Sequence, residues 1–530
     1  MAILELITQT IDSHPILATF LCASFCLYTY NESKKVSELL WSWGALGFSR
    51  LWLQPDLRHI PPVGYSNPIL SFIDVYRYHL DSVGFVQKGY EKFKNQAFKV
   101  PAPRRWVVYL NGSKYLEELR KIPEDVLSSR EIILLISPKA TQAGLFLGPN
   151  FAQNHYHMDI IRHQMTRKVP DFFPELLEEV RESFQKFIPL ENDWKAHNPN
   201  KAILNIIAQS MTRVSLGMPH CRDDELIGTG LALSSHLHFS SLFVAAFPEF
   251  LQPYIVPFLP GLLRNKRKWL KMLTPIIEER KRLIQEGVED HMDVLSWLMD
   301  EAKGPEIASE NLAFRILLIN HASFSTTTLI TVHILYHMAS ELHYLPSLRQ
   351  EMEEAIAEEG WTKNAMDKMH KLDSFIKETM RMRPISAGLV GHKAVQDYTF
   401  SDGTFIPKNT VLVAPVAAVQ YDEANYPNAH EFQGFRFVDQ KGDGDESSRR
   451  SFVSLTSDYF PFGHGNHACP GRFFAASSMK LVLTHLLINY DFMLEKGATA
   501  GGGKRPNDFF VGVVRIPNQQ ARLLFRKRQV

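Results

Sequence analysis

The run Phe460-Pro461-Phe462-Gly463-His464-Gly465-Asn466-His467-Ala468-Cys469-Pro470-Gly471-Arg472 gathers aromatic rings, glycines and histidines around one cysteine. A cysteine thiolate is a soft anionic ligand that suits iron. Gly465 and Gly471 would let the backbone approach a flat cofactor, because glycine has no side chain. Phe462 could cover the sulfur. The composition of this stretch therefore indicates a loop that binds haem through Cys469.

The residues after the cysteine predict a helix. Apolar residues recur at helical spacing from Phe473 to Leu486, and Pro470 suits the first position of such a helix. The free amides at its N-terminus would point at the sulfur and favour thiolate over thiol. The alternative is a buried, inert cysteine beside a helix cap, which is the usual environment of a lone cysteine.

The loop resembles the haem-binding signature of the cytochrome P450 family, Phe-x-x-Gly-x-(Arg or His)-x-Cys-x-Gly. Its fixed positions correspond to Phe462, Gly465, His467, Cys469 and Gly471. This resemblance implies haem b as the cofactor, with Cys469 as the axial ligand of the iron. It also implies the cytochrome P450 fold, mainly α with a small β region, preceded here by one N-terminal transmembrane helix.

Composition is compatible with one large catalytic unit. The chain has 530 residues, of which 45% are hydrophobic and 22% charged, so it can bury a large core. A formal net charge of +1 gives no electrostatic reason to expect a nucleic-acid partner. The four cysteines form no zinc or redox spacing and no disulfide framework, which fits a reducing compartment.

The N-terminus predicts a membrane anchor. No Asp, Glu, Lys or Arg occurs from Ser13 to Asn31, which is about the length a bilayer requires. Lys34 and Lys35 follow the apolar run, so the positive-inside rule places the rest of the chain in the cytosol. A cleaved signal peptide is the alternative, but the basic leader of such a peptide is missing.

These features predict three regions and a location. The location is the endoplasmic reticulum membrane, crossed once, with a cytosolic catalytic domain. The expected regions are the membrane anchor, a juxtamembrane segment with a proline-rich hinge, and the cytochrome P450 domain, at residues 1–34, 35–64 and 65–530.

A second uncharged stretch, from Ile316 to Ser340, carries polar residues in its middle and therefore predicts a helix buried in protein rather than in lipid. Its centre resembles the oxygen-binding element of the family. Thr326 falls on the alcohol that helps deliver protons, and Ser325 falls where an acid is usual. A serine is a poor acid, so proton delivery would need water or another group such as His321. Alternatively, the Thr326 hydroxyl bonds only to its own helix.

Three further residues resemble the network that braces the cysteine loop in this family. Glu378 and Arg381 share one face of a predicted helix, and Arg436 lies in Phe-Arg-Phe, which resembles the Pro-x-Arg-Phe element of the family. Planar guanidinium groups suit such a brace because they bind carboxylates with two parallel bonds. By itself, Glu-x-x-Arg is a common exposed pair.

Two residues are candidates for binding haem propionates. Arg162 lies in a stretch that resembles a helix crossing one haem edge, and guanidinium pairs well with carboxylate. The alternative for Arg162 is a solvated helix face. His392 occupies a position at which fungal relatives usually have an arginine, and histidine is only partly charged near neutral pH.

The resemblance implies a haem-thiolate monooxygenase that inserts one atom of O2 into a C–H bond of a small apolar substrate. It is most similar to fungal members that tailor terpenoids or other secondary metabolites. No nicotinamide or flavin signature is present, so electrons would come from a separate NADPH-cytochrome P450 reductase. The alternatives are a haem-thiolate isomerase or dehydratase that does not use O2, and a membrane-tethered helical scaffold without haem.

Overall fold

The computed structural model describes residues 55–67, 70–102, 105–132, 154–245, 251–287, 292–438, 451–495 and 503–529. The expected anchor at residues 1–34 and residues 35–54 of the expected juxtamembrane segment lie outside these ranges, whereas the proline-rich hinge at the end of the 35–64 region lies within them. Among the helices that are described, none has the length and apolar character needed to cross a membrane.

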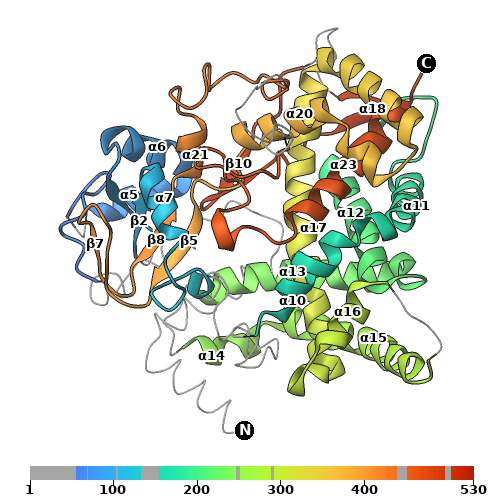
Figure 1. Cartoon of the computed structure of the whole chain (residues 1–530), viewed down its shortest axis with the longest axis horizontal. Coiled ribbons are helices and arrows are strands. Elements are labelled where there is room, and N and C mark those ends of the chain that lie inside the picture. The colour runs from blue at the N-terminus through green and yellow to red at the C-terminus, as the bar shows by residue number, and fades with distance from the viewer. Residues whose placement is uncertain are drawn as a thin grey trace, which may run out of the picture.

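The larger part of the described chain is helical (Figure 1). Its principal helices are α10 (Tyr156–Asp159), α11 (Val169–Phe187), α12 (Pro199–Leu216), α13 (Asp224–Ala245), α14 (Gln252–Ile255), α15 (Pro260–Gln285), α16 (Val294–Glu301), α17 (Ser309–Ser340), α18 (Leu345–Glu359), α19 (Lys363–Asp367), α20 (His370–Met382) and α23 (Arg472–Asn489). A π-helix, η1 (Ile160–Met165), follows α10 directly.

A smaller region contains most of the β-structure, with four helices beside it (Figure 1). These helices are α5 (Ser71–Leu80), α6 (Ser82–Lys92), α7 (Ser113–Leu119) and α21 (Val416–Gln420). The main sheet has the order β1-β2-β8-β5-β3, and only the β2–β8 pair is parallel. Its strands are β1 (Ala97–Pro101), β2 (Trp106–Leu110), β3 (Leu127–Ser128), β5 (Leu389–Ala394) and β8 (Val411–Ala414).

Three small sheets complete the described β-structure. They are β4-β12-β9, β10-β11 and β6-β7. Their strands are β4 (Lys195–His197), β6 (Tyr398–Thr399), β7 (Phe405–Ile406), β9 (Tyr490–Leu494), β10 (Phe509–Val511), β11 (Val514–Ile516) and β12 (Leu523–Lys527). The mainly α architecture with a small β region agrees with the expected fold class.

Helix α17 is the centre of the helical part. It packs against α12, α13, α15, α16, α20 and α23, so its side chains are buried on almost every side. This burial explains why the helix is apolar around most of its circumference without lying in a membrane. The exception is a strip in the middle, where Ala322, Ser325 and Thr326 are exposed.

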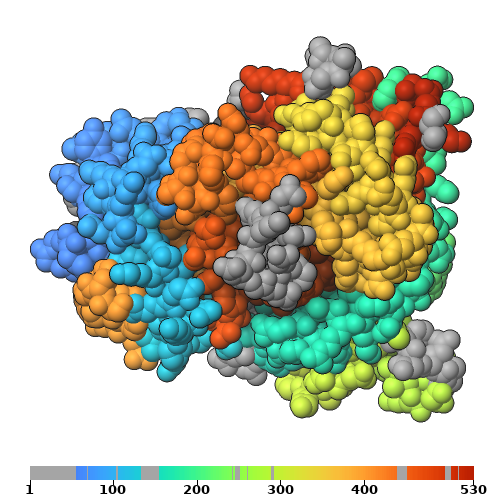
Figure 2. Space-filling view, turned by 45° about the horizontal axis from the view of Figure 1, so that its top comes forward, coloured from blue at the N-terminus to red at the C-terminus, as the bar shows by residue number. Residues whose placement is uncertain are grey.

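The space-filling view shows how the parts meet (Figure 2). The blue N-terminal sheet region and the yellow helical segments occupy opposite sides of this face, and orange and red C-terminal segments lie between them.

Candidate active site

The cysteine loop is held by its own backbone. The amide of Cys469 donates to the carbonyl oxygen of Phe462 at 2.8 Å, and the amide of Gly463 donates to the carbonyl oxygen of Phe460 at 3.0 Å. Gly463 and Gly465 have φ angles of 86° and 60°, which residues with side chains rarely adopt. The turn therefore requires glycine at both positions.

Helix α23 begins after the cysteine, as its sequence predicts, but at Arg472 rather than at Pro470. Gly471 is the N-cap residue, and Pro470 precedes the cap. The first helical position therefore lies two residues beyond Pro470, where the sequence had placed it. The shift matters because the amides nearest the sulfur now come from Gly471 and Arg472.

Cys469 is solvent-accessible and still substantially desolvated by the protein around it. This burial raises the pKa of its thiol above the ordinary value. The backbone amides of Gly471 and Arg472 donate to the sulfur and, together with the Arg472 charge, act in the opposite direction. They stabilise a thiolate, which is the form that ligates a metal.

The rings of His467, which belongs to the cysteine loop, and His392, which belongs to β5, are in contact. Their rings are 5.3 Å apart, edge to face. His467 Nδ1 lies 3.1 Å from Glu124 Oε1 and 3.0 Å from Ser129 Oγ. His392 Nδ1 lies 3.1 Å from the Val390 carbonyl oxygen, while its buried Nε2 has no hydrogen-bond partner among the described residues.

A β-bulge places His392 in this position. The pairing of β5 with β8 shifts between Leu389 and His392, and Val390 has a φ of 56°. A positive φ is strained for a β-branched residue, and bulges often redirect a side chain next to an active site. Burial lowers the pKa of His392, so it is neutral at physiological pH. A neutral histidine can still donate through Nε2.

The glycines of the motif have protein neighbours that the sequence did not indicate. A Cβ added at Gly465 would lie 2.4 Å from Arg120 Cγ, and one added at Gly471 would lie 3.6 Å from Ile161 Cγ2. Gly465 is therefore needed to admit the Arg120 side chain. A Cβ at Gly471 would make only an ordinary van der Waals contact with η1. The surroundings of Gly471 are therefore less crowded than those of Gly465.

Arg162 is partly exposed and lies 3.6 Å from Asp159 on its own helix. It is near enough to Arg472 to lower the pKa of that residue, after the larger effect of burial. The structure thus brings Arg162 toward the cysteine loop. Among the described residues its ion-pair partner is nevertheless Asp159, which is the exposed helix-face contact that the sequence allowed as an alternative.

Ser325 and Thr326 belong to the exposed strip of α17. The Thr326 hydroxyl donates to the Ala322 carbonyl oxygen at 2.7 Å, which is the local bond considered as an alternative. That bond uses the hydroxyl hydrogen and leaves the oxygen able to accept. His321, one turn before Ser325, has its pKa lowered to about 4 by burial and by His238.

Glu378, Arg381 and Arg436 form a buried ion-pair network. Arg381 donates to the Glu378 carboxylate through Nε at 2.7 Å and through Nη2 at 2.8 Å. Arg436 Nε lies 3.1 Å from both carboxylate oxygens. Glu378 and Arg381 are fully buried, so they are more than the exposed pair that the motif alone permits.

The network holds the backbone of residues 420–431, which precede the cysteine loop in the chain. Arg381 Nη1 donates to the carbonyl oxygens of Gln420 and Ala429, both at 2.7 Å. Arg436 donates to the carbonyl oxygens of Pro427, Asn428 and Glu431. Because these bonds satisfy the guanidinium donors, the buried charges keep one fixed geometry.

Three residues of the site were not assigned from the sequence. Arg472 stood at the end of the quoted stretch, where its position next to the helix cap was the available signal. Glu124 and Ser129 belong to no motif, and their contact with His467 depends on the folding of a distant segment.

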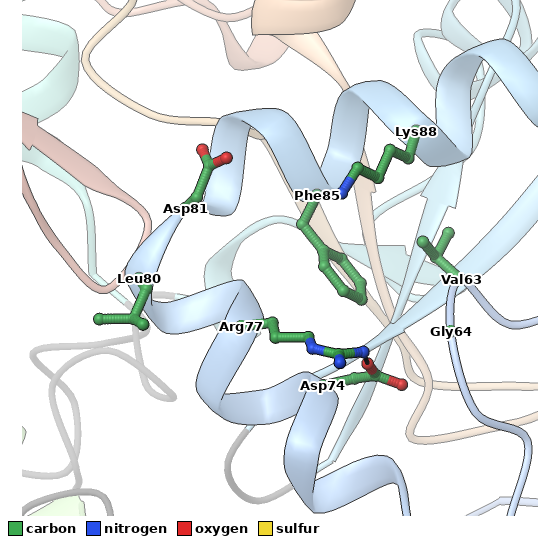
Figure 3. Close-up of a pocket in the computed structure, with 8 residues that line it drawn as sticks. All are labelled: Val63, Gly64, Asp74, Arg77, Leu80, Asp81, Phe85 and Lys88. Atoms are coloured by element: carbon green, nitrogen blue, oxygen red, sulfur yellow. Dashed lines mark hydrogen bonds and ion pairs between the residues drawn. The ribbon is translucent and has the colours of Figure 1, made fainter.

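A surface pocket of about 460 Å³ lies elsewhere, between α5, α6 and the segment with Val63 and Gly64 (Figure 3). In it Arg77 pairs with Asp74 at 3.1 Å, and the Phe85 ring points between them and Lys88. None of its lining residues belongs to the cysteine loop or to α17. This pocket is therefore separate from the candidate active site.

The residues present fit a haem. Cys469 offers an accessible sulfur with two amide donors, His392 offers an unpaired buried nitrogen suited to a propionate, and α17 offers an open polar strip. A mainly helical fold with this arrangement defines the class of haem-thiolate proteins.

Comparison with known proteins gives the family. Residues 97–518 match the family model described as Cytochrome P450. The chain belongs to the cytochrome P450 family.

Two fungal relatives and one solved structure illustrate the likeness. Cytochrome P450 monooxygenase 151 of Postia placenta is 36% identical over 485 residues, covering 90% of this chain and 95% of that protein. The ent-kaurene oxidase of Fusarium fujikuroi is 31% identical over 480 residues, covering 89% and 88%. The cyanobacterial CYP120A1 with bound retinoic acid has a TM-score of 0.66 at 19% identity, covering 88% and 99%, which supports the fold alone.

The protein is accordingly a cytochrome P450 monooxygenase, and its cofactor is haem. The family assignment expected from the cysteine loop is confirmed.

Proposed function

We propose that this monooxygenase inserts one oxygen atom from O2 into a C–H bond of a small apolar substrate, of the terpenoid or a similar secondary-metabolite class. The observation that carries the proposal is the accessible Cys469 thiol, with two backbone amides aimed at its sulfur. The substrate class rests on relatives named ent-kaurene oxidase, 31% identical over 480 residues.

Haem ligated by a thiolate supplies oxygen activation and insertion into an unactivated C–H bond. In the proposed roles, Cys469 ligates the iron, and Phe462, Gly465 and Gly471 shape its loop. His392 and His467 hold the propionate edge, and Arg162 contributes charge there. Two observations support these roles. His392 Nε2 has no hydrogen-bond partner among the described residues, and the His392 and His467 rings are in contact.

The open strip of α17 has the proposed role of proton delivery. The Thr326 oxygen can accept a hydrogen bond from a water, and Ser325 can hold that water in place. Neither hydroxyl is acidic, so the proton comes from solvent through this water. Glu378, Arg381 and Arg436 act at a distance, by bracing the segment before the cysteine loop.

A separate NADPH-cytochrome P450 reductase is the proposed electron donor, and the endoplasmic reticulum membrane is the proposed location. The reasons are the absence of a nicotinamide or flavin signature in the sequence and the uncharged run from Ser13 to Asn31. The proposed organisation is an anchor at residues 1–34, a linking segment at 35–64 and a catalytic domain at 65–530.

The ligand assignment is tested by the spectrum of Cys469→Ala beside Cys221→Ala. Cys221 is buried, and burial raises the pKa of its thiol as it does for Cys469, so Cys221 serves as a control cysteine away from the site. We expect Cys469→Ala to lose the reduced-carbonyl Soret band typical of thiolate ligation and Cys221→Ala to keep it. An unchanged band in Cys469→Ala would overturn the assignment.

The substrate class is tested separately. Microsomes that contain the full chain and a reductase are incubated with candidate terpenoids, and product masses are measured. A gain of one oxygen atom that depends on NADPH and O2 supports the class. Products formed without O2 would instead favour an isomerase or dehydratase.

A further inference from the structure

Arg315 is a fully buried arginine in the first half of α17. Its Nε and Nη2 donate to the Glu306 carboxylate at 3.0 Å and 2.8 Å. Its Nη1 donates to the Asn154 carbonyl oxygen at 2.9 Å and lies 2.8 Å from His157 Nδ1. The guanidinium also lies 4.9 Å from the centre of the Tyr156 ring. One side chain thus joins α17 to the segment that begins α10.

The contact with His157 fixes the chemistry of that histidine. A guanidinium has only donors, so His157 Nδ1 must accept and cannot carry a proton. Burial, together with the smaller effects of Arg315 and His155, lowers the pKa of His157 to about 3. His157 is therefore a neutral acceptor for Arg315 at neutral pH.

The segment held by Arg315 leads directly to the cysteine loop. Helix α10 ends at Asp159 and continues as the π-helix η1. A Cβ added at Gly471 would lie 3.6 Å from Ile161 Cγ2 in η1. A π-helix is a rare conformation that often occurs at functional sites, and it needs support from its surroundings.

These contacts connect the two sides of the site. Arg315 lies on the same helix as Ser325 and Thr326. It also binds His157 and Asn154, in the segment that leads into η1 beside Gly471. Movement of η1 relative to α17 would change the distance between the open strip and the cysteine loop. Arg315 is placed to prevent that movement.

We propose that Arg315 is a positioning residue for the haem: by fixing η1 against the cysteine loop it sets how firmly the protein retains its cofactor. This inference rests on the proposed haem site. It assigns a role to His157 as well, namely that of the acceptor through which Arg315 acts, and not of a group that contacts the haem itself.

The chain offers a matched control in Arg280. Arg280 Nη1 donates to Asp293 Oδ2 at 2.7 Å and to Ser296 Oγ at 2.8 Å, and both members of this ion pair are only 6% exposed. The pair joins α15 to the start of α16, and the hydrogen bonds of Arg280 to described residues reach Asp293, Ser296 and the Leu216 carbonyl oxygen rather than η1 or the cysteine loop. Loss of either arginine leaves a buried carboxylate unpaired, so both changes should weaken folding to a similar extent.

The experiment uses the full chain with haem bound, as wild type, Arg315→Met, Arg280→Met and His157→Phe. Each protein is mixed with excess apomyoglobin, and haem transfer is followed in the Soret region; thermal unfolding and the reduced-carbonyl band are recorded in parallel. We expect haem release to be about 10-fold faster or more in Arg315→Met, because loss of an outer partner of a metal site commonly weakens retention that much.

The two other variants make the result specific. His157→Phe retains the Arg315–Glu306 pair and should also release haem faster, whereas Arg280→Met should release haem at the wild-type rate despite its lower unfolding temperature. Equal acceleration in Arg315→Met and Arg280→Met, or wild-type release in His157→Phe, would overturn the proposal. Absence of the thiolate band in the wild type would instead overturn the proposed haem site.

Discussion

The hydroxyl of Thr326 donates to the carbonyl oxygen of Ala322 at 2.7 Å, and both residues lie on the exposed strip of α17. Thr331 makes the same bond to Thr327 at 2.7 Å but is completely buried. The two threonines are thus alike in their helix and in their local bond. They differ in the exposure of the hydroxyl oxygen, which is accessible in Thr326 and buried in Thr331. A comparison of the two threonines therefore distinguishes a role in proton delivery from a purely structural role in the helix.

Thr326→Ala should raise the share of reducing equivalents that are lost as hydrogen peroxide. The change removes the oxygen that can accept a hydrogen bond from water on the open side, so proton delivery becomes less ordered. The measurement compares NADPH consumed, peroxide formed and product formed. Thr331→Ala is the control and should keep wild-type coupling. Equal coupling in all three proteins would show that Thr326 is structural.

Ser325→Asp should leave haem content unchanged. Ser325 is exposed, so a carboxylate there remains solvated. Thr327, two positions on, is 4% exposed, and Thr327→Asp would bury an unpaired charge. We therefore expect the haem content, measured by the pyridine haemochrome spectrum, to fall only in Thr327→Asp. Loss of haem in Ser325→Asp would contradict the placement of Ser325 on the open strip.

Local sequence was sufficient for the parts of the molecule that depend on neighbouring residues. Strand β2, at Trp106–Leu110, consists of a run of β-formers, so its own residues specify it. The buried helix expected from Ile316 to Ser340 is confirmed within α17, which begins earlier, at Ser309. The cysteine loop was recognisable because its glycines and its cysteine lie close together in the sequence.

Contacts between distant segments were not predictable in the same way. The bond of Arg315 to His157 and that of Ser129 to His467 join residues with no common motif. The strained backbone at Val390 also has no signal in the sequence, since valine is the residue least expected at a positive φ. Such features follow from the packed fold, and they supply the side chains that support the motif residues.

Glu378→Gln should destabilise the protein and reduce haem content. The change keeps the shape of the side chain and removes the charge that pairs with Arg381 and Arg436. Breaking a buried pair in this way costs about 3–5 kcal/mol, because an unpaired charge remains in the interior. Denaturant unfolding measures the loss. Glu279→Gln, which breaks an exposed pair with Arg282, is the control and should leave the unfolding midpoint close to that of the wild type, because solvent screens such a pair.

The opposite outcome for Glu378 would be informative. If Glu378→Gln and Glu279→Gln unfold at the same denaturant concentration, the buried network does not brace the fold. If Glu378→Gln is destabilised and yet retains its full thiolate band, the network supports the helical part without supporting the cysteine loop.

Buried histidines should make the protein less stable as the pH falls below about 6.5. Burial lowers the pKa of His157 and His333 to about 3, and that of His321 and His485 to about 4. In the unfolded chain these histidines regain the ordinary pKa of about 6.5. At pH values between the folded and the unfolded pKa, the unfolded state therefore binds more protons than the folded state. Stability then rises with pH, by roughly 1.4 kcal/mol per pH unit for each such group.

The stabilising contribution of these histidines is complete above the unfolded pKa and is lost as the pH falls toward the folded values. Asp373 acts in the other direction, because burial raises its pKa, but its ordinary titration range lies below that of histidine. The net expectation is a lower unfolding midpoint in denaturant at pH 5 than at pH 7, with haem bound throughout.

His485→Phe isolates one of these groups. The His485 ring lies 4.6 Å from that of Phe184, so phenylalanine can keep the ring contact while removing the titration. This variant should lose less stability than the wild type between pH 7 and pH 5, by up to about 1.4 kcal/mol per pH unit. An identical pH dependence in the two proteins would mean that His485 has the same pKa in the folded and unfolded states, and that its burial does not control its charge.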